Sequence, residues 1–134
     1  MDLKKFYIDG KWVDPINSEY IEIINPSNEK SIGKLYIGSA GDVDKAVVAA
    51  GKSFKSFSKT KVSERIELLK LIREIYKKRF DDIASSIQLE MGAPKNLARG
   101  GQATVGLSHL KTAIRVLENH KFEYMYGNYI VRHE

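Results

Sequence analysis

Three histidines are the side chains of this sequence best suited to bind a metal ion or to move a proton. They are His109, His120 and His133, and the chain has no cysteine to join them. His109 and His120 are eleven positions apart, which on one helix puts them on the same face but about 16 Å apart along its axis. Metal ligands lie about 2 Å from the ion, so these two histidines do not share one. We therefore predict no metal site, and the absence of cysteine excludes a disulfide or a cysteine nucleophile in this chain.

Two glycine-containing stretches are candidates for binding a phosphate or a dinucleotide. Gly51-Lys52-Ser53 matches the end of a P-loop, but the first glycine of that motif falls on Ala46 and the surrounding apolar spacing is helical. Gly100-Gly101 and Gly106 do not form Gly-x-Gly-x-x-Gly, and no strand pattern precedes them. Close packing against another element is the usual reason to keep glycines inside a helix. The sequence thus predicts neither catalytic nor cofactor-binding residues in this chain.

The charged residues have simple helical explanations. Asp81-Asp82 suits the positive end of a helix dipole, and Lys77-Lys78-Arg79 suits the negative end. The 22 Lys and Arg residues exceed the 17 Asp and Glu residues by only five, which is too few to identify a nucleic-acid binder. No signal-peptide pattern opens the chain and no long apolar run follows, so we expect a cytoplasmic protein with no membrane partner.

The elements that would position these residues form an α+β pattern. β-rich N-terminal hairpins come first, with Asp9-Gly10 as a two-residue turn. A layer of four helices follows, and a C-terminal hairpin turns at Gly127-Asn128. We expect strands at about 6–13, 20–24 and 31–37, helices at 39–57, 62–79, 81–91 and 95–119, and the last hairpin at 122–132.

The first helix carries the clearest local signals. Ser39 and Asp42 fit a capping box, in which each side chain satisfies the backbone of the other. An apolar stripe at steps of three and four follows, and we expect its Phe54 and Phe57 to lie in the core beside Leu69 and Ile72. On the last helix the expected buried residues are Leu97, Val105, Leu110, Ile114 and Leu117.

The order of these pieces resembles the N-terminal segment of the aldehyde dehydrogenase superfamily. Each piece alone is common, but their order and spacing over nearly the whole chain are specific. The matching pieces are Tyr7-Ile8-Asp9-Gly10-Lys11-Trp12-Val13, Ile24-Asn25-Pro26-Ser27 with Ile32-Gly33, Asp42-Val43-Asp44-Lys45-Ala46-Val47 with Ala49-Ala50, Glu64-Arg65 with Leu68-Leu69, Asp82-Ile83-Ala84, Leu89-Glu90-Met91-Gly92-Ala93-Pro94, and Arg132-His133-Glu134.

The resemblance implies a role as the N-terminal fragment of an enzyme that oxidises aldehydes to acids with NAD or NADP. In the full α/β fold, residues 1–121 would be an incomplete part of the cofactor-binding domain, flanking a Rossmann-like domain. Residues 122–134 would begin an oligomerisation arm that adds strands to a neighbouring subunit, so the expected partners are the remainder of the enzyme and a second copy. The chain alone would be inactive and bind no NAD, because the family's catalytic and cofactor residues lie downstream.

Two further points follow from the same resemblance. Members of the family often bind a monovalent cation through a main-chain oxygen near Ile24 and a carboxylate on the helix after the Gly-Ala-Pro turn. This chain has the neutral Gln102 near that place, which weakens the expectation. Two alternatives stay open at this point: a stand-alone interaction or regulatory module derived from this layer, and a weak basic nucleic-acid-binding protein.

Overall fold

The β-rich N-terminus forms a small sheet and a separate hairpin. The computed structural model describes residues 2–133, with Asp2 described in its backbone only. β4 (Tyr20–Asn25) pairs antiparallel with β5 (Lys30–Tyr36), and a bulge between Ile23 and Ile24 shifts their register. β1 (Asp2–Leu3) adds to the other edge of β5 as a parallel strand, a pairing too short for the sequence pattern to indicate.

The hairpin predicted at Asp9-Gly10 is confirmed. It joins β2 (Phe6–Ile8) to β3 (Lys11–Val13), and both turn residues have positive φ, 51° and 75°. This backbone matches the right-handed twist of the two strands, and glycine takes it without steric cost. The strands expected at 20–24 and 31–37 are confirmed as β4 and β5.

Helix α1 (Ala40–Phe57) begins with the predicted capping box. The Asp42 carboxylate, only 4% exposed, accepts hydrogen bonds from the Ser39 backbone N–H (3.0 Å) and hydroxyl (2.8 Å) and from the Ile16 N–H (3.2 Å). Burial alone would raise the pKa of this carboxyl. The bonds from Ser39 and Ile16, with the charge of Lys45, outweigh it and hold the pKa below its usual value. The box thus ties the start of α1 to the loop that precedes β4.

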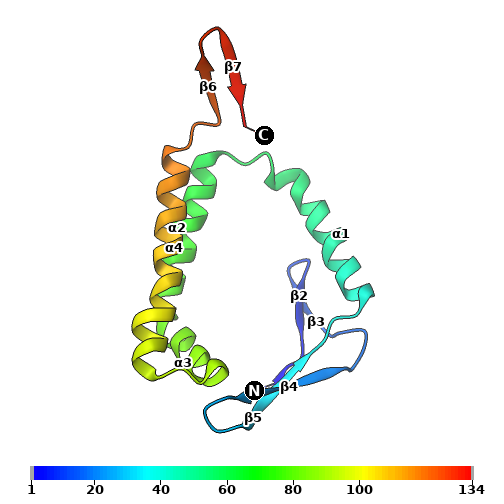
Figure 1. The fold of residues 1–134 in the computed structure, drawn as a ribbon. Coiled ribbons are helices and arrows are strands. Elements are labelled where there is room, and N and C mark those ends of the chain that lie inside the picture. The colour runs from blue at the N-terminus through cyan, green and yellow to red at the C-terminus, as the bar shows by residue number, and fades with distance from the viewer. Residues whose placement is uncertain (1, 134) are drawn as a thin grey trace.

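The predicted burial of Phe54 and Phe57 on α1 is wrong for this chain. Phe54 is 67% exposed and Phe57 50% exposed, because α1 lies on the opposite side of the molecule from α2 (Val62–Lys78) and α4 (Thr104–Asn119), as Figure 1 shows. Ile72, the expected neighbour, is itself 42% exposed. The helical periodicity correctly identified an apolar face, but no element of the described chain covers it.

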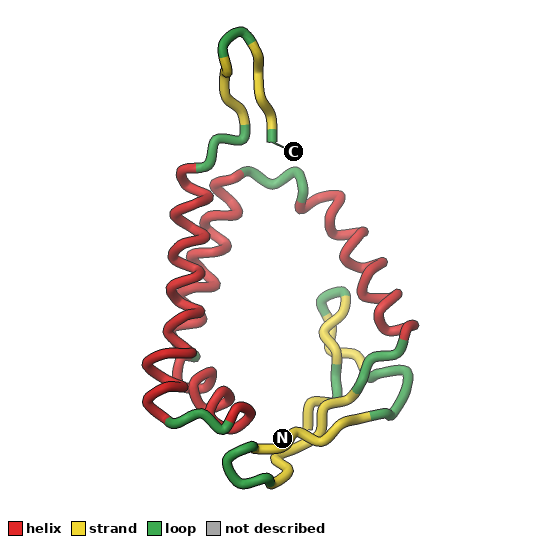
Figure 2. Tube along the Cα trace, in the orientation of Figure 1, coloured by secondary structure: helices red, strands yellow, loops and turns green. Residues whose placement is uncertain are grey.

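Helices α2 and α4 run side by side and antiparallel (Figures 1 and 2). Ile114 of α4 is buried at 5% exposure, as predicted, and Leu110 and Leu117 are half-buried. Tyr76 of α2 reaches across to the start of α4, where its hydroxyl donates a 2.8 Å hydrogen bond to the carbonyl oxygen of Ala103, the residue directly before α4.

The segment expected to be one helix from Lys95 to Asn119 is instead divided. Leu97–Ala103 forms a π-helix, η1, before α4 begins at Thr104. Leu97 and Val105, expected to be buried, are 50% and 47% exposed. The wider winding of a π-helix turns successive side chains by less than 100°, so an α-helical spacing assigns residues here to the wrong face.

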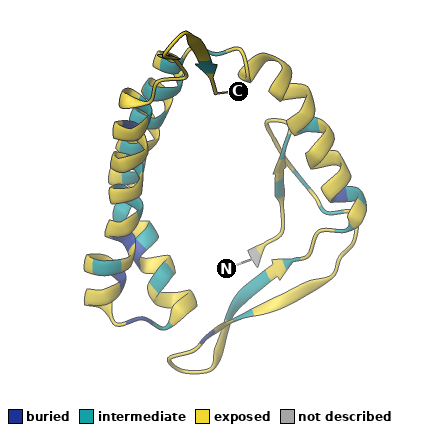
Figure 3. Cartoon of the chain, turned by 45° about the horizontal axis from the view of Figure 1, so that its top comes forward, coloured by how far each residue is buried: buried dark blue, intermediate teal, exposed yellow. Residues whose placement is uncertain are grey.

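The apolar core of the described residues is small. Helix α3 (Phe80–Met91) packs on η1, and Gly92 ends it at φ +63° against the β4–β5 turn. Figure 3 shows the buried residues scattered over several helices and strands rather than gathered in one core. The buried hydrophobic residues are Ala84, Ala93, Ala98, Ala103 and Ile114.

The C-terminal hairpin is confirmed. It pairs β6 (Glu123–Tyr126) with β7 (Tyr129–Arg132) around Gly127-Asn128 and projects from the end of α4 (Figure 1). We call β6, β7 and their turn the terminal hairpin. No helix within residues 2–133 combines the length and the apolar character needed to cross a membrane.

Candidate functional site

The structure places Gly51-Lys52-Ser53 inside α1, well away from any junction between a strand and a helix. All three residues are exposed, and a Cβ atom added at Gly51 would meet nothing within 4 Å. A phosphate cradle needs several backbone N–H groups pointing at the ligand. Those of this segment are engaged in the helix, which agrees with the helical spacing that the sequence indicated.

The glycines at 100, 101 and 106 differ in how closely other atoms approach them. Gly100 and Gly101 lie in η1, and a Cβ at Gly100 would meet nothing within 4 Å. Gly106, in the first turn of α4, faces Tyr76 so closely that a Cβ there would lie 2.6 Å from the tyrosine Cζ. The predicted close packing therefore explains Gly106 and not Gly100.

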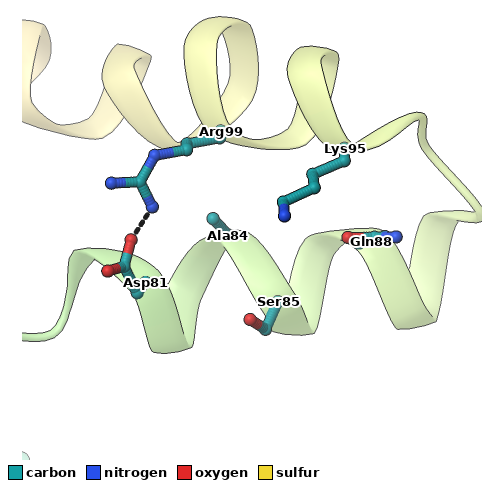
Figure 4. Close-up of a pocket in the computed structure, with 6 residues that line it drawn as sticks. All are labelled: Asp81, Ala84, Ser85, Gln88, Lys95 and Arg99. Carbon is teal, nitrogen blue, oxygen red and sulfur yellow. Dashed lines mark ion pairs between the residues drawn. The ribbon is translucent and has the colours of Figure 1, made fainter.

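A polar groove runs between α3 and η1 (Figure 4). Asp81, expected to begin a helix, lies in the first turn of α3 and forms an ion pair with Arg99 across the groove. Lys95 also points into it, while Asp82 pairs with Arg79 at 3.4 Å. Lys77 of the basic run likewise pairs with Glu74 at 2.9 Å. The acidic groups and their Arg and Lys partners in these pairs are exposed, which is a common arrangement on helix surfaces.

The histidines are brought together in a combination that their spacing did not reveal. His109 lies exposed on α4. His120, directly after α4, meets His133, directly after β7, with 3.2 Å between the Nε2 atom of His120 and the Nδ1 atom of His133. Only the pairing of the terminal hairpin brings residues thirteen positions apart into contact, so the helical arithmetic that compared His109 with His120 missed this pair.

The two residues expected near a monovalent cation lie in β4 and in η1. Ile24 lies at the bulge of β4 and Gln102 is exposed in η1. Among residues 2–133 no group of three or more His, Asp or Glu side chains is arranged to hold a metal ion.

Exposed apolar surface is the most distinctive feature of this structure. One part is the α1 stripe, which we define as Val43, Val47, Phe54 and Phe57, each between 50% and 67% exposed. Another is the terminal hairpin, where Met125, Tyr126, Tyr129 and Ile130 are each at least 58% exposed. Contiguous apolar patches of this kind mark interaction surfaces in soluble proteins. The fold therefore defines an α+β layer whose candidate functional site is an interface.

Comparison with known proteins identifies the family. Residues 12–132 match the aldehyde dehydrogenase family, and the chain belongs to it. It is 41% identical over 127 residues to a 3-succinoylsemialdehyde-pyridine dehydrogenase of Pseudomonas, covering 94% of this chain and 27% of that protein. The match to the N-terminal segment that the motifs indicated is thus confirmed.

Solved structures of aldehyde dehydrogenases share the fold of this chain. The aldehyde dehydrogenase of Bartonella henselae superposes with a TM-score of 0.92 at 37% identity, over 96% of this chain and 27% of that one. Aldehyde dehydrogenase C of Pseudomonas syringae, solved as a mutant with NAD⁺ and octanal, gives 0.89 at 35% identity, over 93% of this chain and 26% of that one. The present chain therefore spans about a quarter of the length of the relatives that it matches.

Proposed function

We propose that this chain is the non-catalytic leading layer of an NAD(P)-dependent aldehyde dehydrogenase. Residues 1–121 would belong to the cofactor-binding domain, and residues 122–134 would begin the oligomerisation arm. The observation that carries the proposal is the family match over residues 12–132 with only about a quarter of the relatives' length covered.

The α1 stripe supports this role. A helix that exposes Phe54 and Phe57 is unfavourable in water, since a buried aromatic side chain contributes about 1.5–3 kcal/mol that an exposed one does not. The remainder of the enzyme is the natural cover for this face, because its relatives have nearly three times as much further chain in the same molecule. The stripe would then be an interface within one protein.

The terminal hairpin supports the second part of the proposal. Two strands alone are marginal in water, and both edges of β6–β7 have backbone groups available for a further strand. Strand addition at such an edge gives affinity through main-chain hydrogen bonds. A second copy of the enzyme is the partner that we propose for it.

The described residues themselves do not fit a dinucleotide. Their glycine-rich stretches lie inside α1 and η1, and the parallel pairing within residues 2–133 is limited to β1 with β5. We therefore assign NAD(P) binding and the hydride transfer to the rest of the proposed enzyme, and to this chain the scaffold that supports them.

A chimaeric enzyme tests the proposal. Residues 1–134 replace the matching segment of the Pseudomonas syringae aldehyde dehydrogenase C, restored to its wild-type catalytic sequence, and octanal-dependent reduction of NAD⁺ is measured. We expect a soluble, active chimaera of the same oligomeric state as the parent. A folded but inactive chimaera would contradict the scaffold role and favour a stand-alone module.

Matched variants locate the interface. Val47 lies in the α1 stripe, whereas Lys52 is five residues on and, at about 100° per residue, projects from a different side of α1. Val47→Asp should leave the separate chain folded, because Val47 is 63% exposed there, but should abolish assembly of the chimaera. Lys52→Asp should affect neither. Equal activity of both chimaeras would show that the stripe is not covered.

A further inference from the structure

The contact between His120 and His133 closes the root of the terminal hairpin and has no part in the proposed scaffold role. Nε2 of His120 and Nδ1 of His133 are 3.2 Å apart, within hydrogen-bond distance. Both side chains are exposed, so the pair is open to solvent and to dissolved ions.

The two rings are held in place by their surroundings. The backbone N–H of His133 donates a 2.8 Å hydrogen bond to the carbonyl oxygen of Phe122, which fixes one strand end against the other. The Phe122 ring meets the His120 ring edge-on at 4.5 Å between centroids, and Tyr124 meets His133 in the same way at 5.7 Å. Aromatic contacts of this geometry restrict the rotation of each imidazole.

The spacing of the two nitrogens suits a shared metal ion. Imidazole nitrogens bind zinc at about 2.0–2.1 Å, so two ligands of a tetrahedral ion lie about 3.3–3.4 Å apart. The observed 3.2 Å is close to this separation, and both rings would turn so that their lone pairs point to one side of the line between the nitrogens. In the metal-free pair one nitrogen donates a proton to the other. When a metal binds, that proton moves to the outer nitrogen of its own ring, and both inner nitrogens then offer a lone pair.

We propose that His120 and His133 form a two-imidazole site for a divalent first-row transition ion, with water filling the remaining positions. Imidazole favours zinc, copper and nickel over magnesium and calcium, which prefer oxygen. The neighbouring charges set the strength: Lys121 opposes a cation, whereas Arg132 is neutralised by Glu123 at 2.7 Å. The site is therefore one of modest affinity, and binding would clamp the ends of the hairpin together.

Equilibrium dialysis against Zn²⁺ tests the site, because it counts bound metal whatever the oligomeric state of the chain. The proteins are the 134-residue chain, His120→Ala, His133→Ala, and His109→Ala as the matched control on α4. Loss of an outer partner of a metal ligand weakens binding about 10- to 100-fold, so loss of a ligand should weaken it at least about tenfold. We expect one zinc per chain in the wild type and in His109→Ala, and the weakened binding in the other two.

A spectroscopic readout separates this site from nonspecific uptake. Cu²⁺ bound to the wild type should show the electron paramagnetic resonance splitting of two nitrogen ligands, reduced to one in either alanine variant. Circular dichroism confirms that the variants keep their helices. Equal zinc uptake by all four proteins, or a loss in His109→Ala as large as in the others, would overturn the proposal and leave the pair as a hydrogen-bonded latch.

Discussion

The contact between Gly106 and Tyr76 allows a prediction in which two opposing effects can be weighed. A Cβ atom at Gly106 would lie 2.6 Å from Cζ and 2.8 Å from Cε2 of Tyr76. These distances are far inside van der Waals contact, so Tyr76 would have to move. Its hydroxyl would then lose the hydrogen bond to the Ala103 carbonyl oxygen.

The magnitudes decide the sign of the effect. Replacing glycine by alanine in a helix contributes about 1 kcal/mol of stability. Forcing an extra carbon into a packed contact costs about 1–3 kcal/mol, and a lost hydrogen bond costs about another 1 kcal/mol. Gly106→Ala should therefore lower the free energy of unfolding by about 1–3 kcal/mol, although alanine is the better helix former.

Gly100→Ala is the matched control. Gly100 lies six residues earlier, where an added Cβ meets nothing within 4 Å, so this change should be neutral or should raise stability by about 0.4–1 kcal/mol. Urea unfolding of the two variants and the wild type, followed by circular dichroism at one protein concentration, gives the comparison. If Gly106→Ala were as stable as Gly100→Ala, α2 and α4 would not pack as the structure shows.

Four other outcomes are expected. Asp42→Asn should reduce the loss of stability at acid pH. The folded-state pKa of Asp42 lies below the unfolded value of about 3.9, so the carboxylate stabilises the fold above that pH and this contribution is lost as pH falls through the lowered pKa. Circular dichroism measured over a pH titration of both proteins gives the comparison. Phe54→Ala should change the free energy of unfolding of the separate chain, measured with urea, by less than about 0.5 kcal/mol, since Phe54 is exposed. Deleting residues 122–134 should reduce self-association in a sedimentation series, where a monodisperse full chain at high concentration would argue against open edges. Calorimetry with millimolar NAD should show no saturable heat.

Local features of the fold could be predicted because a few neighbouring residues determine them. Ser39 and Asp42 satisfy each other's backbone within one turn, and Asp9-Gly10 accepts the positive φ values of its hairpin. The family assignment also came from the sequence, through the order of several short motifs. Each of these signals needs no knowledge of what lies elsewhere in the molecule.

Features that depend on distant partners could not be predicted in this way. The π-helical winding of Leu97–Ala103 changes which side chains face α3, and the apolar spacing of the sequence does not distinguish this winding from an α-helix. The contact of His120 with His133 depends on the register of β6 with β7. The parallel pairing of β1 with β5 involves two residues of each strand, too few to form a pattern.

The error over Phe54 is the most informative, because periodicity reports which face of a helix is covered and not what covers it. The surfaces of this chain are of two kinds. The α2–α4 contact is satisfied within the chain, by Ile114 and by Tyr76 against Gly106, so changes there should alter the stability of the chain itself. The α1 stripe has the same apolar spacing but no cover, so its spacing reflects burial in a larger assembly. Substitutions in the stripe should therefore be nearly silent in the separate chain and severe once the rest of the enzyme is present.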